Sequence, residues 1–135
     1  GVSNHQAEHL REITDATGIA PAVNQIEISP YLTQEPLRAL HAQMGIVTEA
    51  WSPLARGKVA CDPTILAIGA ELGRTASQVV LRWHIQRGDV VFPIVENAQL
   101  FDFALSPAQM DAVSALDRGE RQGSHPDMVQ WTERP

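Results

Sequence analysis

Three apolar stretches of this sequence end in side chains that offer hydrogen bonds or a flat aromatic surface to a ligand. The side chains are Ser3 and Asn4 in the first stretch, Asn24, Gln25 and Glu27 in the second, and Trp51 and Ser52 in the third. Each stretch is typical of a strand, and a helical pattern follows it. Strands that alternate with helices form parallel sheets, and ligands bind beyond the carboxyl ends of such strands. The sequence therefore predicts one shared binding site at three strand ends.

The second expected strand, residues 22–27, carries polar side chains on both of its faces. Gln25 and Glu27 share one face, and Asn24 lies on the other. A central parallel strand is normally a near-continuous apolar run, so other polar groups must meet these side chains. Asn24 and Gln25 either satisfy loop backbone groups inside the core or contact a ligand, and the residues alone leave both alternatives open.

The elements that position this site follow one another as strand, helix, strand, helix, strand, two helices, strand, helix and tail. The expected strands lie at 1–4, 22–27, 46–51 and 89–93. The expected helix caps are Asn4, Thr33, Asp62, Thr75 and Ser106, and the last helix is expected to end at Gly119. Such an order forms either a small doubly wound sheet or half of an eight-stranded barrel, which usually needs about 250 residues. No Gly-x-Gly-x-x-Gly follows any strand, which disfavours the doubly wound sheet.

Composition places the 135 residues in one domain, 1–135, with a tail at 120–135. Its 44% hydrophobic residues can form a core, and the tail carries Met128 and Trp131 as apolar anchors. The net charge of −6, with ten scattered Lys and Arg, argues against a nucleic-acid partner. We expect no membrane segment and a cytoplasmic location, because apolar runs are short and Cys61 is alone. Gly1 lies inside an expected strand, so we expect the natural chain to begin earlier.

Several single residues have a functional and a structural interpretation. Cys61 is expected to be a small hydrophobe or an exposed thiol rather than a nucleophile. His5 and His9 are four residues apart, which is half of a metal site, but no third ligand with suitable spacing lies nearby, so we predict no metal. His41 and Trp83 both fall on apolar helix faces, and each is expected to pack in the core rather than bind a ligand.

Blocks of the sequence, taken together, resemble the aldo-keto reductases, and most closely the bacterial 2,5-diketo-D-gluconate reductase type. The blocks are residues 1–4, 21–27, 30–31, 49–54, 79–83 and 101–103. The resemblance implies an α/β fold, the C-terminal half of a (β/α)8 TIM barrel with strands five to eight. It also implies NAD(P)H-dependent reduction of aldehydes or ketones to alcohols, with a small carbonyl compound as substrate.

The resemblance further implies a cofactor site for NADPH. Ser3, Asn4 and Gln25 match side chains that bind the nicotinamide carboxamide, and Trp51 matches the aromatic residue that stacks on the nicotinamide ring. The other matches are Ser52, Leu54 and Arg56 along the pyrophosphate, Glu96 and Asn97 near the adenine, and Trp131 in the loop that closes over substrate. Arg56 also belongs to a short basic loop that suits an anion, and Trp131 could equally pack against the barrel.

The sequence departs from the family at three places. The catalytic Asp, Tyr, Lys and His of the family belong to the preceding half of the barrel, and the lone Tyr31 matches a non-catalytic position. We therefore assign no catalytic residue and expect the isolated chain to be inactive. A Lys-Ser segment and an Arg that bind the 2′-phosphate are missing after Pro93, so cofactor binding should be weak and NADH is possible. His5 stands where the family has an aromatic residue.

A second interpretation is a non-catalytic half-barrel that acts as a self-associating binding or assembly module. Family members are mostly monomeric, but four parallel strands without their partners leave two open edges. Unpaired edges favour association with another chain. Such a module should dimerise or aggregate.

Overall fold

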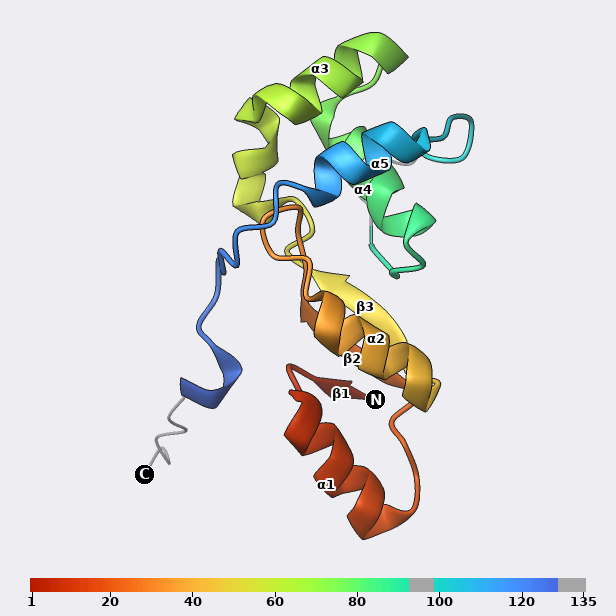
Figure 1. Ribbon diagram of the computed structural model, residues 1–135, viewed down its shortest axis with the longest axis vertical. Helices are drawn as coiled ribbons and strands as arrows, with labels where there is room; N and C mark the ends of the chain where they lie inside the picture. Colours follow the sequence, from red (N-terminus) through yellow and green to blue (C-terminus); the bar gives the residue numbers. More distant parts are fainter. Residues whose placement is uncertain (93–98, 129–135) are drawn as a thin grey trace.

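A three-stranded parallel sheet forms the centre of the computed structural model, which describes residues 1–92 and 99–128 (Figure 1). Its strands are β1 (Val2–Ser3), β2 (Val23–Glu27) and β3 (Val47–Trp51), in the order β1-β2-β3. Ser3 lies opposite Gln25, and Gln25 lies opposite Glu49. The strands run in one direction because a helix follows each of the first two, α1 (Ala7–Thr17) and α2 (Glu35–Met44).

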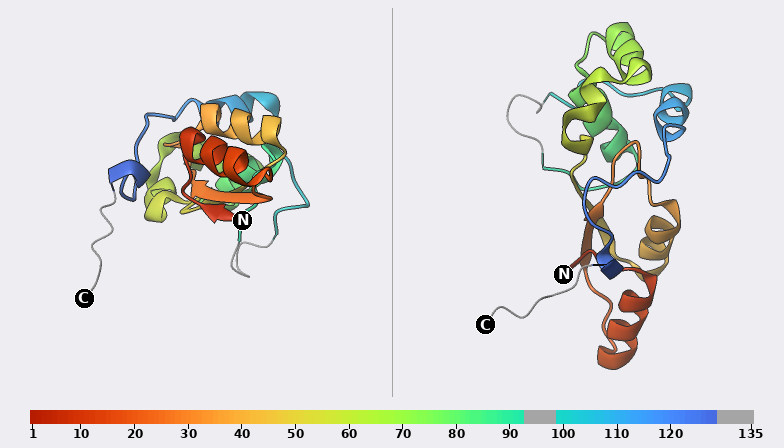
Figure 2. Two further views of the ribbon diagram at one scale, coloured as in Figure 1. Left: turned by 90° about the horizontal axis from the view of Figure 1, so that it is seen from below. Right: turned by 90° about the vertical axis from the view of Figure 1, so that its left-hand side faces the viewer.

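Helices α1 and α2 cover the same face of this sheet (Figure 2). A second group of helices comprises α3 (Pro63–Leu72), α4 (Ala76–Gln86) and α5 (Pro107–Ser114), which pack on one another. The 3-10 segment η1 (Ala55–Cys61) joins β3 to this group, and a short 3-10 turn, η3 (Pro126–Met128), lies in the tail. The chain after α5 runs back past the carboxyl ends of the strands (Figure 1).

The prediction of a fourth strand at residues 89–93 is wrong for the described residues, which form no extended strand there. The pairing is reduced to one parallel bridge between Val90 and Glu49. The Val90 N–H donates to the Thr48 carbonyl at 2.9 Å, and the Ala50 N–H donates to the Val90 carbonyl at 2.8 Å. The backbone therefore pairs in the expected parallel direction, but for only one residue.

Local capping signals predict three helix starts correctly and two incorrectly. The Asp62 carboxylate accepts the N–H groups of Thr64 and Ile65, and the Thr75 and Ser106 capping boxes are formed. Asn4 and Thr33 are not caps: the caps are Gln6 and Gln34. Asn4 and Thr33 bind distant partners instead, and a side chain with a tertiary partner is not free to cap.

The last helix ends at Ser114, earlier than the expected Gly119. Beyond it, the N–H groups of Arg118 and Glu120 donate to the Tyr31 carbonyl at 3.3 and 2.9 Å. The hydroxyl of Thr33 donates to the Asp117 carboxylate. These contacts draw the backbone away from a helical path and onto the loop after β2.

The core lies between the sheet, η1 and both helix groups, and Trp83 is the largest of the fully buried side chains among the described residues. The Trp83 Nε1–H donates to Ser114 Oγ at 3.0 Å, which confirms the expectation that this ring packs in the core. Helices in the part of the chain that the structure describes are too short or too polar to span a bilayer.

Candidate functional site

Asn4, Gln25 and Trp51 meet at the carboxyl edge of the sheet. Asn4 leaves β1 with a φ of 58°, a conformation in which asparagine is enriched. Its N–H donates to the Gln25 carbonyl at 2.8 Å, and its Oδ1 accepts the indole Nε1–H of Trp51 at 2.8 Å. Side chains from the ends of β1 and β3 are thus joined directly across β2.

Among the described residues, three polar groups at the ends of β1 and β2 have no hydrogen-bond partner. They are the Ser3 hydroxyl, the Asn4 side-chain Nδ2 and the Gln25 side-chain Oε1. The other half of the Gln25 amide is occupied, because its Nε2 donates to the Glu49 carboxylate. One amide donor, one amide acceptor and one hydroxyl therefore remain for a ligand. A ligand carboxamide, which has both a donor and an acceptor, complements this set.

Asn24 acts in the core, on the opposite face of β2. It is fully buried, and its Nδ2 donates to the His5 carbonyl at 2.9 Å. The same Nδ2 lies 3.0 Å from His41 Nε2, and His41 Nδ1 lies 2.9 Å from the Thr48 hydroxyl. Burial, and next the charge of Arg38, lower the pKa of His41, which favours the neutral ring. The expectation that His41 is a packed histidine is confirmed.

The segment after Trp51 makes a tight turn with several left-handed residues. Ser52, Ala55 and Arg56 have φ values of 53°, 49° and 53°. Such conformations are uncommon for residues with a Cβ and often mark functional sites. Arg56 is exposed, whereas Lys58 forms an ion pair with Glu120 of the tail. Among the described residues Arg56 forms no ion pair, so of the two cations in this loop it is the candidate to bind an anion.

The tail binds the ends of β2 and β3 through Glu27, a contact that the sequence did not predict. The Glu27 side chain is buried, and its carboxylate accepts the backbone N–H groups of Gln122 and Gly123. Gly123 in turn packs against the indole of Trp51. The partners are separated by 95 and 96 residues in the chain, and no periodic pattern joins them.

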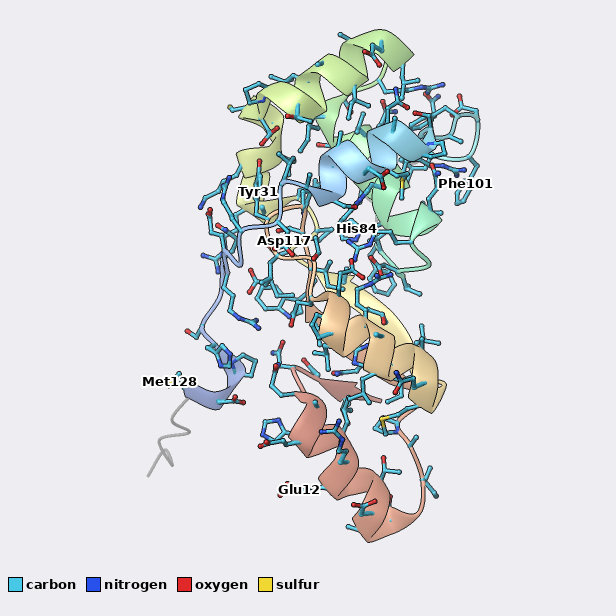
Figure 3. The ribbon with its side chains drawn as sticks, in the orientation of Figure 1. Glu12, Tyr31, His84, Phe101, Asp117 and Met128 are labelled. Carbon is cyan, nitrogen blue, oxygen red and sulfur yellow. The ribbon has the colours of Figure 1, made fainter. Side chains whose placement is uncertain are left out.

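A second buried network, also missed, supports the turn after Trp51. The Asp89 carboxylate accepts the Arg38 Nε–H at 2.8 Å, and its other oxygen lies 3.0 Å from His84 Nδ1. His84 projects from α4 toward the sheet (Figure 3), with Nε2 3.5 Å from the Pro53 carbonyl oxygen. Burial lowers the pKa of His84. Burial opposes ionisation of Asp89, but the His84 hydrogen bond and the neighbouring positive charges outweigh it and lower its pKa.

A cavity of about 770 Å³ opens beside the strand ends, between α1 and the tail. Its lining comprises Ser3, Asn4, His5, His9, Glu12, Ile13, Ala16, Ser124 and Pro126. Only Ser3 and Asn4 belong to the predicted cofactor site, while Gln25 and Trp51 lie outside this lining. The unpaired polar atoms at the strand ends, rather than the cavity, therefore define the candidate site.

The model of the Aldo/keto reductase family matches residues 1–118. The chain belongs to the aldo-keto reductase family. This membership confirms the resemblance inferred from the sequence blocks. An aldo-keto reductase of Mycobacterium sp. (strain KMS) is 48% identical over 139 residues, which cover 98% of this chain and 50% of the relative. The 2,5-diketo-D-gluconic acid reductase B of Corynebacterium sp. (strain SHS752001) is 44% identical over 135 residues, which cover 94% of this chain and 49% of that relative.

A solved structure has the same fold as this aldo-keto reductase chain over the part that matches. A mutant of Gox0644 in complex with NADPH superposes with a TM-score of 0.93 at 42% identity, covering 97% of this chain and 51% of that one. The chain thus spans about half the length of the relatives it matches.

Other predicted residues of the aldo-keto reductase chain have plain structural positions or lie outside the described part. His9 Nδ1 accepts the Gln6 N–H, and His5 Nδ1 lies 3.1 Å from the Ser3 carbonyl oxygen. No group of three His, Cys, Asp or Glu within residues 1–92 and 99–128 could hold a metal ion. Cys61 is an exposed free thiol. Pro93, Glu96, Asn97 and Trp131 lie outside the described residues, so their roles stay predictions.

Tyr31 is the one tyrosine of this aldo-keto reductase chain, and its titration can be followed alone. Its hydroxyl donates to Asp62 Oδ2 at 3.0 Å (Figure 3 shows Tyr31 near η1). Burial, then the hydrogen bond and charge of Asp62, raise the pKa of Tyr31 to about 12. We expect tyrosinate absorbance to titrate near pH 12 in the native chain and near about 10 in urea.

The sign of the stability change follows from that shift. Because the folded pKa lies above the unfolded one, stability is retained below about pH 10 and is lost as the pH rises toward 12. Asp62→Asn keeps a capping side chain but removes the charge. The midpoint of the tyrosinate titration in the native chain should therefore move part of the way from pH 12 toward about pH 10. A native midpoint at the urea value would contradict the buried hydrogen bond.

Proposed function

We propose that this chain forms the nicotinamide-binding half of an NAD(P)H-dependent aldo-keto reductase that reduces aldehydes or ketones to alcohols. The observation that carries the proposal is the set of Ser3 Oγ, Asn4 Nδ2 and Gln25 Oε1 beside the Trp51 indole, which have no hydrogen-bond partner within residues 1–92 and 99–128. A carboxamide needs a donor and an acceptor, and a planar ring needs an aromatic surface. Both are present at one edge of the sheet. The NADPH held by Gox0644, a structural neighbour, supports the same cofactor.

In this proposal the chain binds and orients the cofactor. The nicotinamide, when bound, supplies hydride to the carbonyl carbon. Asn4 and Gln25 hold the carboxamide and so fix the rotation of the ring, while Trp51 covers one ring face and leaves the other to the substrate. Ser52, Leu54 and Arg56 lie along the pyrophosphate, where Arg56 provides the positive charge. Glu96 and Asn97 would lie near the adenine and Trp131 near the substrate, and all three lie outside the described residues.

In this proposal the proton for the alcohol comes from outside this chain. Tyr31 cannot provide it, because its hydroxyl is buried and donates to Asp62, and its raised pKa makes it a weaker acid. We propose that β1, β2 and β3, with the Val90 bridge, are strands five to eight of a TIM barrel whose first half supplies the acid. The relatives' double length supports this assignment.

The proposal includes a weakened preference for NADPH over NADH. The alignment with the Mycobacterium sp. relative spans 139 positions, more than the 135 residues of this chain, so that relative has residues that this chain lacks. A missing 2′-phosphate-binding segment after Pro93 would produce such a difference. Without that segment the charge contacts that distinguish the two cofactors are lost.

The test is a hybrid barrel. The matching half of the Corynebacterium sp. reductase is replaced with this chain, and NADPH oxidation with 2,5-diketo-D-gluconic acid is measured. We expect the hybrid to turn over with a raised KM for NADPH and the isolated chain to show no turnover. The first half of the parent enzyme alone is the control. A folded hybrid that binds neither NADPH nor NADH would overturn the proposal.

The alternative, a self-associating module without catalysis, is favoured by one observation. Among the described strands, β1 has a partner on one side only, which leaves its outer edge open for pairing. The hybrid barrel separates the two functions. A module that serves assembly alone would complete the barrel without restoring cofactor binding.

A further inference from the structure

Glu27 is a buried carboxylate held by backbone N–H groups of the tail. It is 1% exposed, and among the described residues no Lys, Arg or His forms an ion pair with it. Its Oε1 accepts the Gln122 N–H, and the Gly123 N–H lies 3.2 Å from Oε2 and 3.4 Å from Oε1. A buried charge is costly unless hydrogen bonds satisfy it, and bonds to a charged acceptor are strong. The carboxylate therefore fixes the tail backbone at residues 122–123.

Gly123 meets the outer edge of the Trp51 indole. A Cβ built on Gly123 would lie 2.5 Å from Cη2 and 3.4 Å from Cζ2 of that ring. A contact of 2.5 Å is too short for a real Cβ, so a larger residue would displace either the tail or the ring. The pyrrole ring of the same indole is held by the Nε1–H bond to Asn4. The indole of Trp51 is thus contacted at two points, at its pyrrole nitrogen by Asn4 after β1 and at its benzo ring by the tail.

We infer that Glu27 and Gly123 are positioning residues for Trp51: Glu27 anchors the tail, and Gly123 sets how closely the tail approaches the indole edge. The tail thereby determines the tilt of the aromatic surface at the strand ends. Insofar as this surface holds a nicotinamide, the inference rests on the proposed function. The contact itself does not depend on a cofactor. Substituting a residue 72 positions from Trp51 should therefore change the environment of its ring.

The first measurement is the indole N–H resonance of Trp51 in the 135-residue chain without cofactor, assigned by its loss in Trp51→Phe. We expect Gly123→Ala and Glu27→Gln each to shift this resonance, while the Trp83 resonance stays in place. Glu8→Gln, at an exposed position of α1, is the matched control for the charge change. Gly18→Ala, a glycine with open space around it, is the control for general backbone strain. An unshifted Trp51 resonance in folded Gly123→Ala would overturn the inference.

The second measurement is rescue by a smaller ring. Gly123→Ala should lower Tm by roughly 3–10 °C, because overpacking displaces close neighbours. In the Trp51→Phe background the benzo ring that meets Gly123 is absent. Gly123→Ala should therefore lower Tm by only a small part of that amount. Equal Tm losses in both backgrounds would show that the collision is elsewhere and would refute the positioning role. If Gly123→Ala fails to fold, the Trp51 resonance in Glu27→Gln tests the inference: a shift supports it, and an unshifted resonance refutes it.

Failure of this inference and failure of the proposed function give different results. In the hybrid barrel, Gly123→Ala should weaken NADPH binding several-fold. A shifted indole resonance in a hybrid that binds neither NADPH nor NADH would refute the proposed function and leave the positioning role intact. If the hybrid binds NADPH but Gly123→Ala leaves the Trp51 resonance unshifted, the positioning role is refuted and the proposed function stands.

Discussion

Replacing Asp89 with alanine is expected to lower the free energy of unfolding by roughly 3–5 kcal/mol, because it leaves buried polar partners without their counter-charge. The Asp89 side chain is fully buried and holds both Arg38 Nε at 2.8 Å and His84 Nδ1 at 3.0 Å. Arg38 also donates to the Arg87 carbonyl, so the loss affects the junction of α2 with the end of α4. Urea denaturation of the wild type and the variant at neutral pH measures the difference.

Two comparisons make that result specific to the buried network. Asp15→Ala removes an exposed carboxylate on α1 and should change stability by no more than about 0.5 kcal/mol. The effect of Asp89→Ala should also shrink in acid. The pKa of Asp89 is lowered in the fold, so its contribution is present above the unfolded value and is lost as the pH falls through the folded one. A loss below 1 kcal/mol at neutral pH would show that the network does not support the fold.

What the sequence could predict in this chain depends on how local the signal is. Asp62, Thr75 and Ser106 cap helices as predicted, because each partner lies within three residues. Asn4 and Thr33 have the same cap-forming side chains but bind Trp51 and Asp117, which lie 47 and 84 residues away. Capping propensity is a local preference, and a tertiary partner overrides it.

The same distinction divides the candidate site. The predicted placement of Asn4, Gln25 and Trp51 at one edge follows from strand direction alone, since carboxyl ends of parallel strands lie together. The Glu27 contact with the tail could not be predicted that way. Its one sequence signal is a charged residue in a strand that should be buried, which indicates that a partner is needed but not which one. Gly123, in an aperiodic tail, carries no signal at all.

Trp51→Ala in the hybrid barrel is expected to weaken NADPH binding by about 10- to 100-fold, as loss of ring stacking costs roughly 1–3 kcal/mol. The indole is held by Asn4 at Nε1 and by Gly123 at its edge, so its surface is ordered before a ligand binds. An ordered surface gives up little entropy on binding, and its removal should appear as a loss of affinity. Isothermal titration with NADPH measures the loss directly.

The choice of ligand separates stacking from every other contribution of Trp51. NADH carries the same nicotinamide and should lose affinity by the same factor, whereas 2′-phospho-ADP-ribose lacks that ring and should bind both proteins equally well. Trp51→Phe keeps an aromatic surface and should recover most of the affinity while losing the bond to Asn4. The opposite outcome is that Trp51→Ala weakens the binding of 2′-phospho-ADP-ribose as much as that of NADPH. Because that ligand has no nicotinamide ring, its loss of affinity would mean that the phosphate site had moved. Trp51 would then support the turn at Ser52 and Arg56 rather than the nicotinamide.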